Sequence, residues 1–300
     1  MTKAPPTPKG FRDIRPEMAK RRRAIINTIA NILEEFKFEP IETPTIEFAE
    51  TILGKYGDEA DKLVYTFEDR GERKLALRYD LTVPLARYVA TYNPQVPFRR
   101  YQVGQVFRAD NPQKGRWREF TQMDADTIGS SDLLEDAKIV AAAIRAVKEV
   151  GLSNPVMVIN DRKNFDGYSK ETVIAIDKFD KIGDEGVIAE MVKSGMTQTQ
   201  AKDTLEEIKN KKPTPDIEKI LANLKNLGLN DSEFKFDPTL ARGLDYYTGS
   251  IFELRSPSYG NLSLGAGGRY DNLVGMFSKK SLPAVGFSFG LDRLIDALNT

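Results

Sequence analysis

The chain has 300 residues, 40% of them hydrophobic, which is enough to bury one large core or one core with a small appended module. Lysine plus arginine and aspartate plus glutamate number 44 each, so a contact with nucleic acid would have to come from local basic patches. The sequence contains neither cysteine nor histidine, which excludes disulfides, thiolate nucleophiles, zinc–thiolate sites and a histidine base.

Composition also limits the cofactors and the location that we expect. A metal ion would have to bind oxygen ligands, which favours magnesium that arrives with a nucleotide. No run of about 18 apolar residues occurs, and residues 1–6 lack the apolar centre of a signal peptide. These features predict a soluble, cytoplasmic protein with no membrane partner.

Two elements are predicted before residue 50. Between residues 18 and 36, apolar side chains recur at helical spacing from Ile25 to Phe36, which predicts an amphipathic helix. Residues 40–47 contain two prolines among β-branched side chains, a composition that suits one edge strand.

Residues 102–126 have the pattern of a β-hairpin with a long basic loop. Its polar-rich face consists of Gln102, Gly104, Val106 and Arg108 on the incoming strand and Arg118, Phe120, Gln122, Asp124 and Asp126 on the outgoing strand. Burying so many unpaired polar groups would cost roughly 2–7 kcal/mol each, so this face must meet water, a ligand or itself. A ligand with phosphate, metal and a planar ring would suit it.

Helices are predicted in the middle of the chain. Residues 131–151 carry an apolar stripe, with Gly151 as the expected stop. Residues 163–230 read as short helices rich in lysine and glutamate, the last of which begins at Thr214 and ends at Gly228.

Strands are predicted again at residues 251–254 and 284–289. In the second of these, Val285, Phe287 and Phe289 make one bulky face, while the other face carries alanine, glycine and serine. A strand face almost without side chains allows a flat base or a ribose to lie against the backbone.

Five segments in family order resemble class II aminoacyl-tRNA synthetases, and among these the histidyl branch. The hairpin matches motif 2, whose histidyl pattern is F-R-x-(D/E)-x-P-x-x-G-R-x-R-(E/Q)-F. The sequences LRYDLTVP, ARGLDYYTG and GGRYDNL match histidyl-branch segments, at residues 77–84, 241–249 and 267–273. Residues 284–294 resemble motif 3, and the helix and strand before residue 50 resemble motif 1, the dimer interface of the class.

The resemblance implies an α+β fold, in which an antiparallel sheet flanked by helices holds ATP and an amino acid within a homodimer. It assigns residues 1–162 and 231–300 to the catalytic core and residues 163–230 to a helical insertion domain. The implied reaction joins histidine and ATP, with Mg²⁺, into histidyl-adenylate and then transfers histidine to tRNA(His).

The resemblance also implies which residues bind ATP. Arg108 would hold the α-phosphate and Arg116 the distal phosphates, with Asp110 beside them. Phe120 would stack on adenine, and Arg293 would reach the nucleotide from the opposite side. A guanidinium suits phosphate because it offers a rigid fork of donors, although a single arginine is usually a solvated surface charge and a phenylalanine usually a core residue.

The histidine-binding residues follow from the same resemblance. The α-amino group would be bound by Asp80, Thr82 and Gln122. The imidazole pocket would be lined by Asp126, Tyr247 and the nearby Tyr246.

Arg242 is the implied catalytic residue, together with Arg108 of motif 2. It would pair the substrate carboxylate with the α-phosphate, and its alternative is a salt bridge to Asp245 or Glu253. Gln113 would lie at the acceptor end of the tRNA.

Three further features concern the glycines, the two residues that follow them, and one carboxylate near the end of the chain. Gly265, Gly267 and Gly268 either allow close approach of the backbone to a ligand or form a glycine-rich turn. The next two residues, Arg269 and Tyr270, would brace the pocket. Asp292 stands where many family members carry glutamate, which weakens any role for that carboxylate.

The position of the last residue bears on the expected function. The synthetase family continues past motif 3 into an anticodon-binding domain, whereas this sequence ends at Thr300, so we expect an excised catalytic core or a short paralogue. The second hypothesis is therefore a histidine-binding regulatory subunit of ATP phosphoribosyltransferase, which does not charge tRNA. Arg242 and Arg116 favour the synthetase, and a purely structural dimeric scaffold would not need the polar hairpin face.

Overall fold

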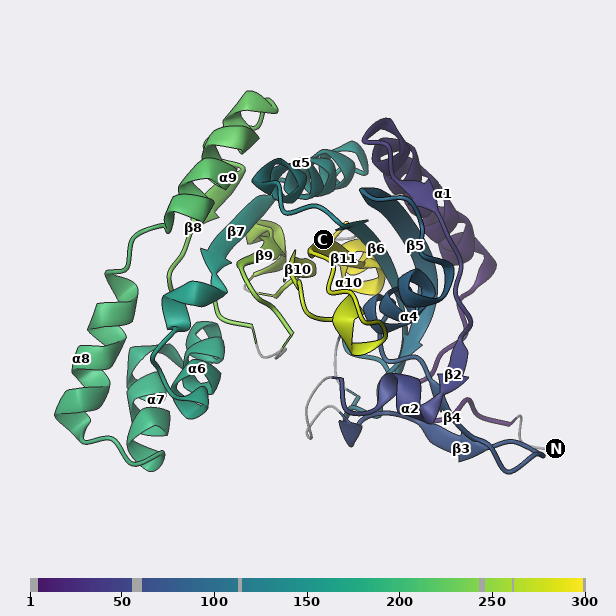
Figure 1. Cartoon of the computed structure of the whole chain (residues 1–300), viewed down its shortest axis with the longest axis horizontal. Coiled ribbons are helices and arrows are strands. Elements are labelled where there is room, and N and C mark those ends of the chain that lie inside the picture. The colour runs from purple at the N-terminus through teal and green to yellow at the C-terminus, as the bar shows by residue number, and fades with distance from the viewer. Residues whose placement is uncertain (1–4, 56–60, 113–114, 243–245, 261, 299–300) are drawn as a thin grey trace.

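An eight-stranded sheet forms the centre of the molecule (Figure 1). The computed structural model describes residues 5–55, 61–112, 115–242, 246–260 and 262–298. In spatial order the strands are β1 (Glu39–Pro40), β5 (Phe98–Phe107), β6 (Glu119–Ile128), β11 (Ala284–Gly290), β10 (Gly265–Arg269), β9 (Ser250–Arg255), β7 (Val156–Asp161) and β8 (Phe234–Phe236). Neighbouring strands are antiparallel except at the two edges, where β1 pairs with β5 and β7 with β8 in parallel.

Helices cover this sheet, and a small second sheet lies beside it. The helices that pack with the main sheet include α1 (Pro16–Glu35), α5 (Leu133–Glu149) and α10 (Leu291–Ala297). A three-stranded sheet in the order β2 (Ile46–Phe48), β4 (Lys74–Leu77) and β3 (Thr66–Glu68) lies at the lower right of Figure 1 with α2 (Ala49–Ile52), which packs in turn against α4 (Thr82–Tyr92). Short 3₁₀ turns occupy Arg162–Phe165, Pro257–Tyr259 and Val274–Met276.

The apolar stripes of α1 and α5 pack into one cluster over the sheet. On α1 the buried residues are Ile25, Ile29, Ile32 and Leu33, as the helical spacing predicted. The helix begins at Pro16, two residues before the predicted start, because a proline at the first position lacks only an N–H that has no helical partner. No helix among the described residues is long and apolar enough to cross a membrane.

Helix α5 begins and ends at the signals in its sequence. The Asp132 side chain caps its N-terminus by accepting from the backbone N of Leu134 at 3.0 Å. Val150 is the C-cap, and Gly151 follows with φ of +91°, which confirms the predicted stop.

Strands β5 and β6 form the predicted hairpin. Their register places Gln102 opposite Asp124 and Gly104 opposite Gln122, so the two polar-rich rows share one face. On the next strand, β11, Val285 and Phe289 are buried in the main core. The hairpin and the motif 3 strand are therefore neighbours, with β11 paired to β6 along seven residues.

The prediction of a single edge strand at residues 40–47 is wrong. The segment divides into β1, at the edge of the main sheet, and the start of β2 in the small sheet. Pro40 and Pro44 lack the N–H that a continuous ladder needs, so the chain leaves one sheet before it enters the other.

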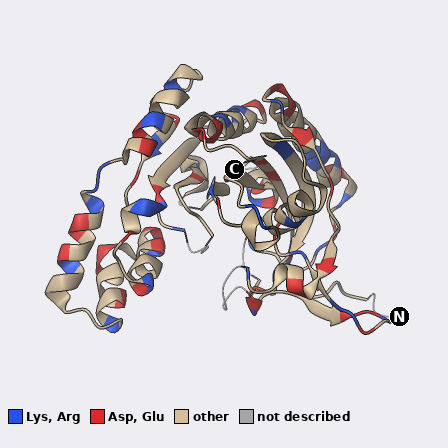
Figure 2. Cartoon of the chain, in the orientation of Figure 1, with Lys and Arg blue, Asp and Glu red and all other residues tan. Residues whose placement is uncertain are grey.

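Residues 163–230 are helical, as predicted. The elements are α6 (Lys170–Asp177), α7 (Phe179–Lys193), α8 (Gln198–Lys209) and α9 (Pro215–Asn226). Thr214 caps α9 and Gly228 follows it with φ of +88°. Apolar residues of α6, α7 and α8 form a separate cluster, whereas α9 packs against α5 at the top of Figure 1. Acidic and basic residues are interspersed along these helices (Figure 2).

Candidate active site

One pocket lies against the polar face of the hairpin. All the predicted site residues that the structure describes line it, namely Asp80, Thr82, Arg108, Asp110, Arg116, Phe120, Gln122, Asp126, Arg242, Tyr246, Tyr247 and Arg293. Gln113 falls outside the described residues. Segments that are far apart in the sequence meet here because β6, β11, β10 and β9 are neighbours in the sheet.

The floor of the pocket is the backbone of β10 and β11. A Cβ added to Gly286 would lie 1.8 Å from Asp126 Oδ1, and one added to Gly267 would lie 2.1 Å from the backbone oxygen of Gly286. No side chain fits at either position. Residues 265–269 form a strand, so the alternative of a glycine-rich turn is wrong and that of close backbone approach remains.

Four arginines surround one part of the pocket. The Arg108 guanidinium lies 4.3 Å from the Tyr79 ring and 5.1 Å from the Phe120 ring, and its Nε donates to the backbone oxygen of Tyr79 at 3.1 Å. Arg293 donates to two backbone oxygens, of Gly115 at 3.2 Å and of Ser263 at 3.0 Å.

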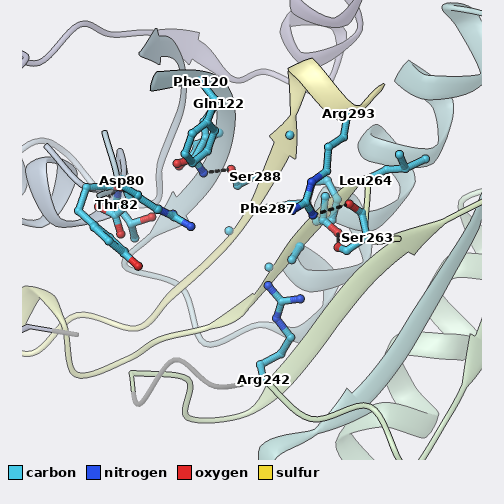
Figure 3. A pocket seen from close by; sticks show the side chains of 18 of the residues that line it. Asp80, Thr82, Phe120, Gln122, Arg242, Ser263, Leu264, Phe287, Ser288 and Arg293 are labelled. Carbon is cyan, nitrogen blue, oxygen red and sulfur yellow. Dashed lines mark hydrogen bonds between the residues drawn. The ribbon is translucent and has the colours of Figure 1, made fainter. Parts of the chain in front are cut away.

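The arginines repel one another. Burial lowers the pKa of Arg293, and the positive charges of Arg116, Arg108 and Arg242 lower it further. An anionic ligand between these side chains would relieve that repulsion. Figure 3 shows Arg293 and Arg242 reaching toward each other from opposite sides of the pocket.

Oxygen acceptors gather at the other part of the pocket. Asp80 precedes α4 and accepts from the backbone N of Thr82 at 3.1 Å and of Val83 at 3.0 Å. The Gln122 amide nitrogen donates to Ser288 Oγ, which fixes the amide (Figure 3). Two buried oxygens, Gln122 Oε1 and Asp124 Oδ1, have no hydrogen-bond partner among the described residues. They suit a ligand that donates hydrogen bonds or carries positive charge.

Asp126 is held from two sides. Arg100, which is fully buried, lies 2.7 Å from Asp126 Oδ2, and the Tyr270 hydroxyl donates to Oδ1. Burial raises the pKa of Asp126, against the opposing effects of Arg100 and Tyr270. Burial likewise raises the pKa of the neighbouring Asp124 to about 7.

Arg100 and Asp124 were not assigned a role from the sequence. The two-residue period of the hairpin, carried one step back from Gln102, reaches Arg100, and the register places Arg100 directly opposite Asp126. Asp124 was recognised on the polar face but given no function. Tyr270 was expected to brace the pocket, and its bond to Asp126 agrees with that expectation.

Two tyrosines form the wall that Arg242 adjoins. The Tyr246 and Tyr247 rings are 4.8 Å apart, and Tyr246 meets the Tyr270 ring edge-on at 5.9 Å. Arg242 Nη1 donates to Glu253 Oε2 at 2.7 Å. The expected salt bridge to Glu253 is therefore present, and the side chain also points into the pocket, so the catalytic role of Arg242 stays a prediction (Figure 3).

Asp292 borders the pocket but is already occupied by the protein. Its Oδ1 accepts from Arg12 and, at 2.5 Å, from Arg22, while its Oδ2 accepts from the backbone N of Thr121 at 2.8 Å. The Asp292 carboxylate, which stands where many family members carry glutamate, thus joins the N-terminal segment, β6 and α10.

The family model for histidyl-tRNA synthetase matches residues 10–183 and 185–294. The chain belongs to the histidyl-tRNA synthetase family. A histidine–tRNA ligase of Aeropyrum pernix is 40% identical, over 98% of this chain and 74% of the relative. The match extends over three quarters of that longer protein.

Solved structures of the family agree with the fold. A histidyl-tRNA synthetase from Nostoc sp. PCC 7120 superposes with a TM-score of 0.83 at 30% identity, over 98% of this chain and 75% of the other. A protein from Bacillus halodurans, described as an ATP phosphoribosyltransferase regulatory subunit/histidyl-tRNA synthetase, superposes at 0.79 with 27% identity, over 100% and 85%. The predicted α+β fold and family are thereby confirmed.

Proposed function

We propose that this chain activates histidine with ATP to form histidyl-adenylate and transfers histidine to tRNA(His), as a cytoplasmic enzyme. The observation that carries the proposal is the division of one pocket into an arginine-rich part and a part lined by buried acceptors. Adenylation joins a carboxylate to the α-phosphorus of ATP, so both reacting groups are anions. The pocket supplies positive charge where they would meet.

The arginine-rich part would bind ATP. Arg108, held between Tyr79 and Phe120, would hold the α-phosphate, and Arg116 and Arg293 the distal phosphates. Phe120 would face the adenine across the bare backbone of β11, with Asp110 beside the nucleotide. Fixed guanidinium groups lower the barrier because they are already oriented toward the charge that develops in the transition state.

Magnesium would reach this site with the nucleotide. Among the described residues, no group of three or more acidic side chains is placed to hold a metal ion. Mg²⁺ would then be bound chiefly through phosphate oxygens, and it would neutralise their charge as pyrophosphate leaves.

The acceptor-rich part would bind histidine. Asp80, Gln122 and the N-terminus of α4 at Thr82 would receive the α-ammonium group, and the partnerless Gln122 oxygen supports this placement. Asp126 would accept from one imidazole N–H, with Tyr247 and Tyr246 forming the rest of the ring pocket. Arg242 would then reach the carboxylate and the α-phosphate together.

Two partners are proposed as well. The loop that follows Phe107, with Gln113, would meet the acceptor end of the tRNA. A second copy of the chain would cover the small sheet, on which the directly paired Phe48, Leu75 and Phe67 share one face. Phe48 and Phe67 are exposed, at 50% and 41%.

A second function is favoured by one observation. The B. halodurans structure is described as a regulatory subunit of ATP phosphoribosyltransferase as well as a synthetase. Such a subunit would bind histidine without activating it.

Histidine-dependent exchange of pyrophosphate into ATP separates the two functions. We expect the purified chain to catalyse this exchange with histidine and not with other amino acids. Histidine binding without any exchange would support the regulatory subunit and reject the synthetase.

A further inference from the structure

A series of ion pairs runs from Arg242 to the helical segment between motifs 2 and 3. Arg242 Nη1 donates to Glu253 Oε2 at 2.7 Å. The other oxygen, Glu253 Oε1, accepts from Arg255 Nε at 2.7 Å. Arg255 Nη2 in turn donates to Asp180 Oδ2. Four side chains of alternating charge therefore connect the pocket with α7.

The backbone explains why these groups align. Glu253 and Arg255 are two residues apart on β9, so they lie on the same face of the strand. Asp180 lies in the first turn of α7, directly after the end of α6. The corner between α6 and α7, residues 177–180, therefore faces the end of β9.

The inner members of the series are shielded from water. The Glu253 and Arg255 side chains are 10% and 16% exposed, against 39% for Asp180. Although burial opposes it, the charges of Glu253 and then Asp180 raise the pKa of Arg255. Shielded pairs of this kind fix a side chain more strongly than pairs on the surface.

Besides Asp180, the α6–α7 corner supplies a second carboxylate, which acts on Arg242 directly. Asp177 ends α6, and burial raises its pKa while the charge of Arg242 lowers it. Two carboxylates therefore attract the Arg242 guanidinium. Asp177 belongs to the helical segment, and Glu253 is held by it through Arg255.

We propose that Glu253, Arg255 and Asp180 are positioning residues, which hold the Arg242 guanidinium at the pocket and make its placement depend on docking of the α6–α7 corner against β9. The proposal rests on the catalytic role proposed above for Arg242. Glu253 engages Nη1, and the guanidinium has further donors on Nε and Nη2 for a ligand. A displacement of the corner would release Arg255, which would then draw Glu253 away from Arg242.

Asp180→Asn tests the proposal, because it removes one charge at the most exposed end of the series and keeps the shape of the side chain. We expect the kcat of pyrophosphate exchange to fall about five- to ten-fold, as for loss of one partly buried coupling, with the KM for ATP and the melting temperature nearly unchanged. Asp180→Glu, which retains the charge, should restore most of the activity.

Asp184→Asn is the matched control. Asp184 lies in α7 beyond a kink at Gly183 and also forms an ion pair, with Lys209 of α8 at 2.9 Å, but this pair is not connected to β9. We expect this variant to exchange pyrophosphate like the unmodified chain. An equal loss of kcat in the two variants would overturn the proposal, because a general weakening of the helical segment would then explain both.

The pairing with Arg242 is tested by a double variant. In an Arg242→Ala chain, Asp180→Asn should lower the residual rate no further, since the group that it positions is gone. The same five- to ten-fold loss in both backgrounds would overturn the proposal. Normal exchange by Arg242→Ala alone would reject the catalytic assignment instead.

A chain without any exchange activity would reject the proposed synthetase function but would still allow a decision on positioning. Calorimetric titration with histidine then replaces kinetics, because Arg242 would still face the carboxylate of bound histidine. Asp180→Asn should weaken that binding, and Asp184→Asn should not. Equal affinities for Asp180→Asn and the unmodified chain would overturn the positioning role.

Discussion

Arg242 is paired within the protein and lines the pocket as well. Its Nη1 donates to Glu253, and the side chain borders the proposed substrate site. We expect Arg242→Ala to slow adenylate formation by about 10²-fold or more, the usual effect of removing a group that stabilises transition-state charge. Arg242→Lys should not restore the rate, because an ammonium cannot reproduce the fork. The rate of histidyl-adenylate formation in a single turnover tests both expectations. A near-normal rate in the alanine variant would exclude the catalytic role.

Asp124 should make stability depend on pH in an unusual direction. Burial raises its pKa in the folded chain to about 7, from 3.8 for an unperturbed carboxyl. The folded state therefore holds a proton that the unfolded state has lost, and stability falls as the pH rises from about 4 to 7. Above pH 7 the whole cost is present, because the buried carboxylate is ionised in both states.

We expect Asp124→Asn to remove this cost. Its melting temperature should exceed that of the unmodified chain at pH 8, by on the order of 5 °C, and should differ little at pH 4.5. Scanning calorimetry of both proteins at the two pH values provides the comparison. A variant that melted lower at pH 8 would mean that the ionised carboxylate stabilises the unliganded fold.

At the scale of single residues, the sequence predicted the polar row of the hairpin but not the partners of each group. The alternation from Gln102 to Asp126 required a polar face, because a buried face of that composition would be too costly. The choice between a catalytic and a paired Arg242 could not be made, since it depends on where Glu253 of another strand lies. The contact between Gly286 and Asp126 likewise arises only once β11 pairs with β6.

At the scale of elements, that contact leads to a prediction. Gly286→Ala places a methyl group where Asp126 Oδ1 lies, at 1.8 Å, so the carboxylate must move away from Arg100 and Tyr270. We expect the KM for histidine to rise by about ten-fold or more and the KM for ATP to change less, as for loss of one buried charged hydrogen bond.

Gly275→Ala is the corresponding control. Its added methyl would meet nothing closer than 3.5 Å, at Ser281, and Gly275 does not line the pocket. Steady-state kinetics with each substrate varied in turn gives both constants. Equal increases in the two KM values for Gly286→Ala would place Asp126 outside the histidine site.

Elements with local signals were predictable and those set by distant contacts were not. The ends of α5 and α9 follow from caps and glycines within a few residues of each terminus. Residues 40–47 offered only a composition compatible with an edge. Their division between two sheets depends on β5 and β4, to which β1 and β2 pair.

At the scale of the whole molecule, the order of the strands assembles the site. Residues near 120, 242 and 290 meet because β6, β11, β10 and β9 are adjacent, an order that periodicity and composition do not specify. The resemblance to a family of known fold supplied that information. The division at residues 163 and 230 stays a prediction, and the packing of α9 on α5 joins part of the helical segment to the main core.

The whole molecule should also form a homodimer through its small sheet. Ile46, Phe48 and Phe67 expose 45%, 50% and 41% of their surface, and their register places them with Leu75 and Leu77 on one face. An exposed apolar sheet face of this kind is a common feature of subunit interfaces, and a two-fold contact would bury it in both copies.

Phe48→Asp should therefore convert a dimer to a monomer, because it would place two unpaired carboxylates in the interface. Ile174→Asp is the control, since Ile174 is a comparably exposed apolar residue on α6, remote from the small sheet. Sedimentation equilibrium of the three proteins measures the mass of each. A monomeric unmodified chain would reject the dimer. A Phe48→Asp chain that stayed dimeric would mean that the two copies meet through another surface.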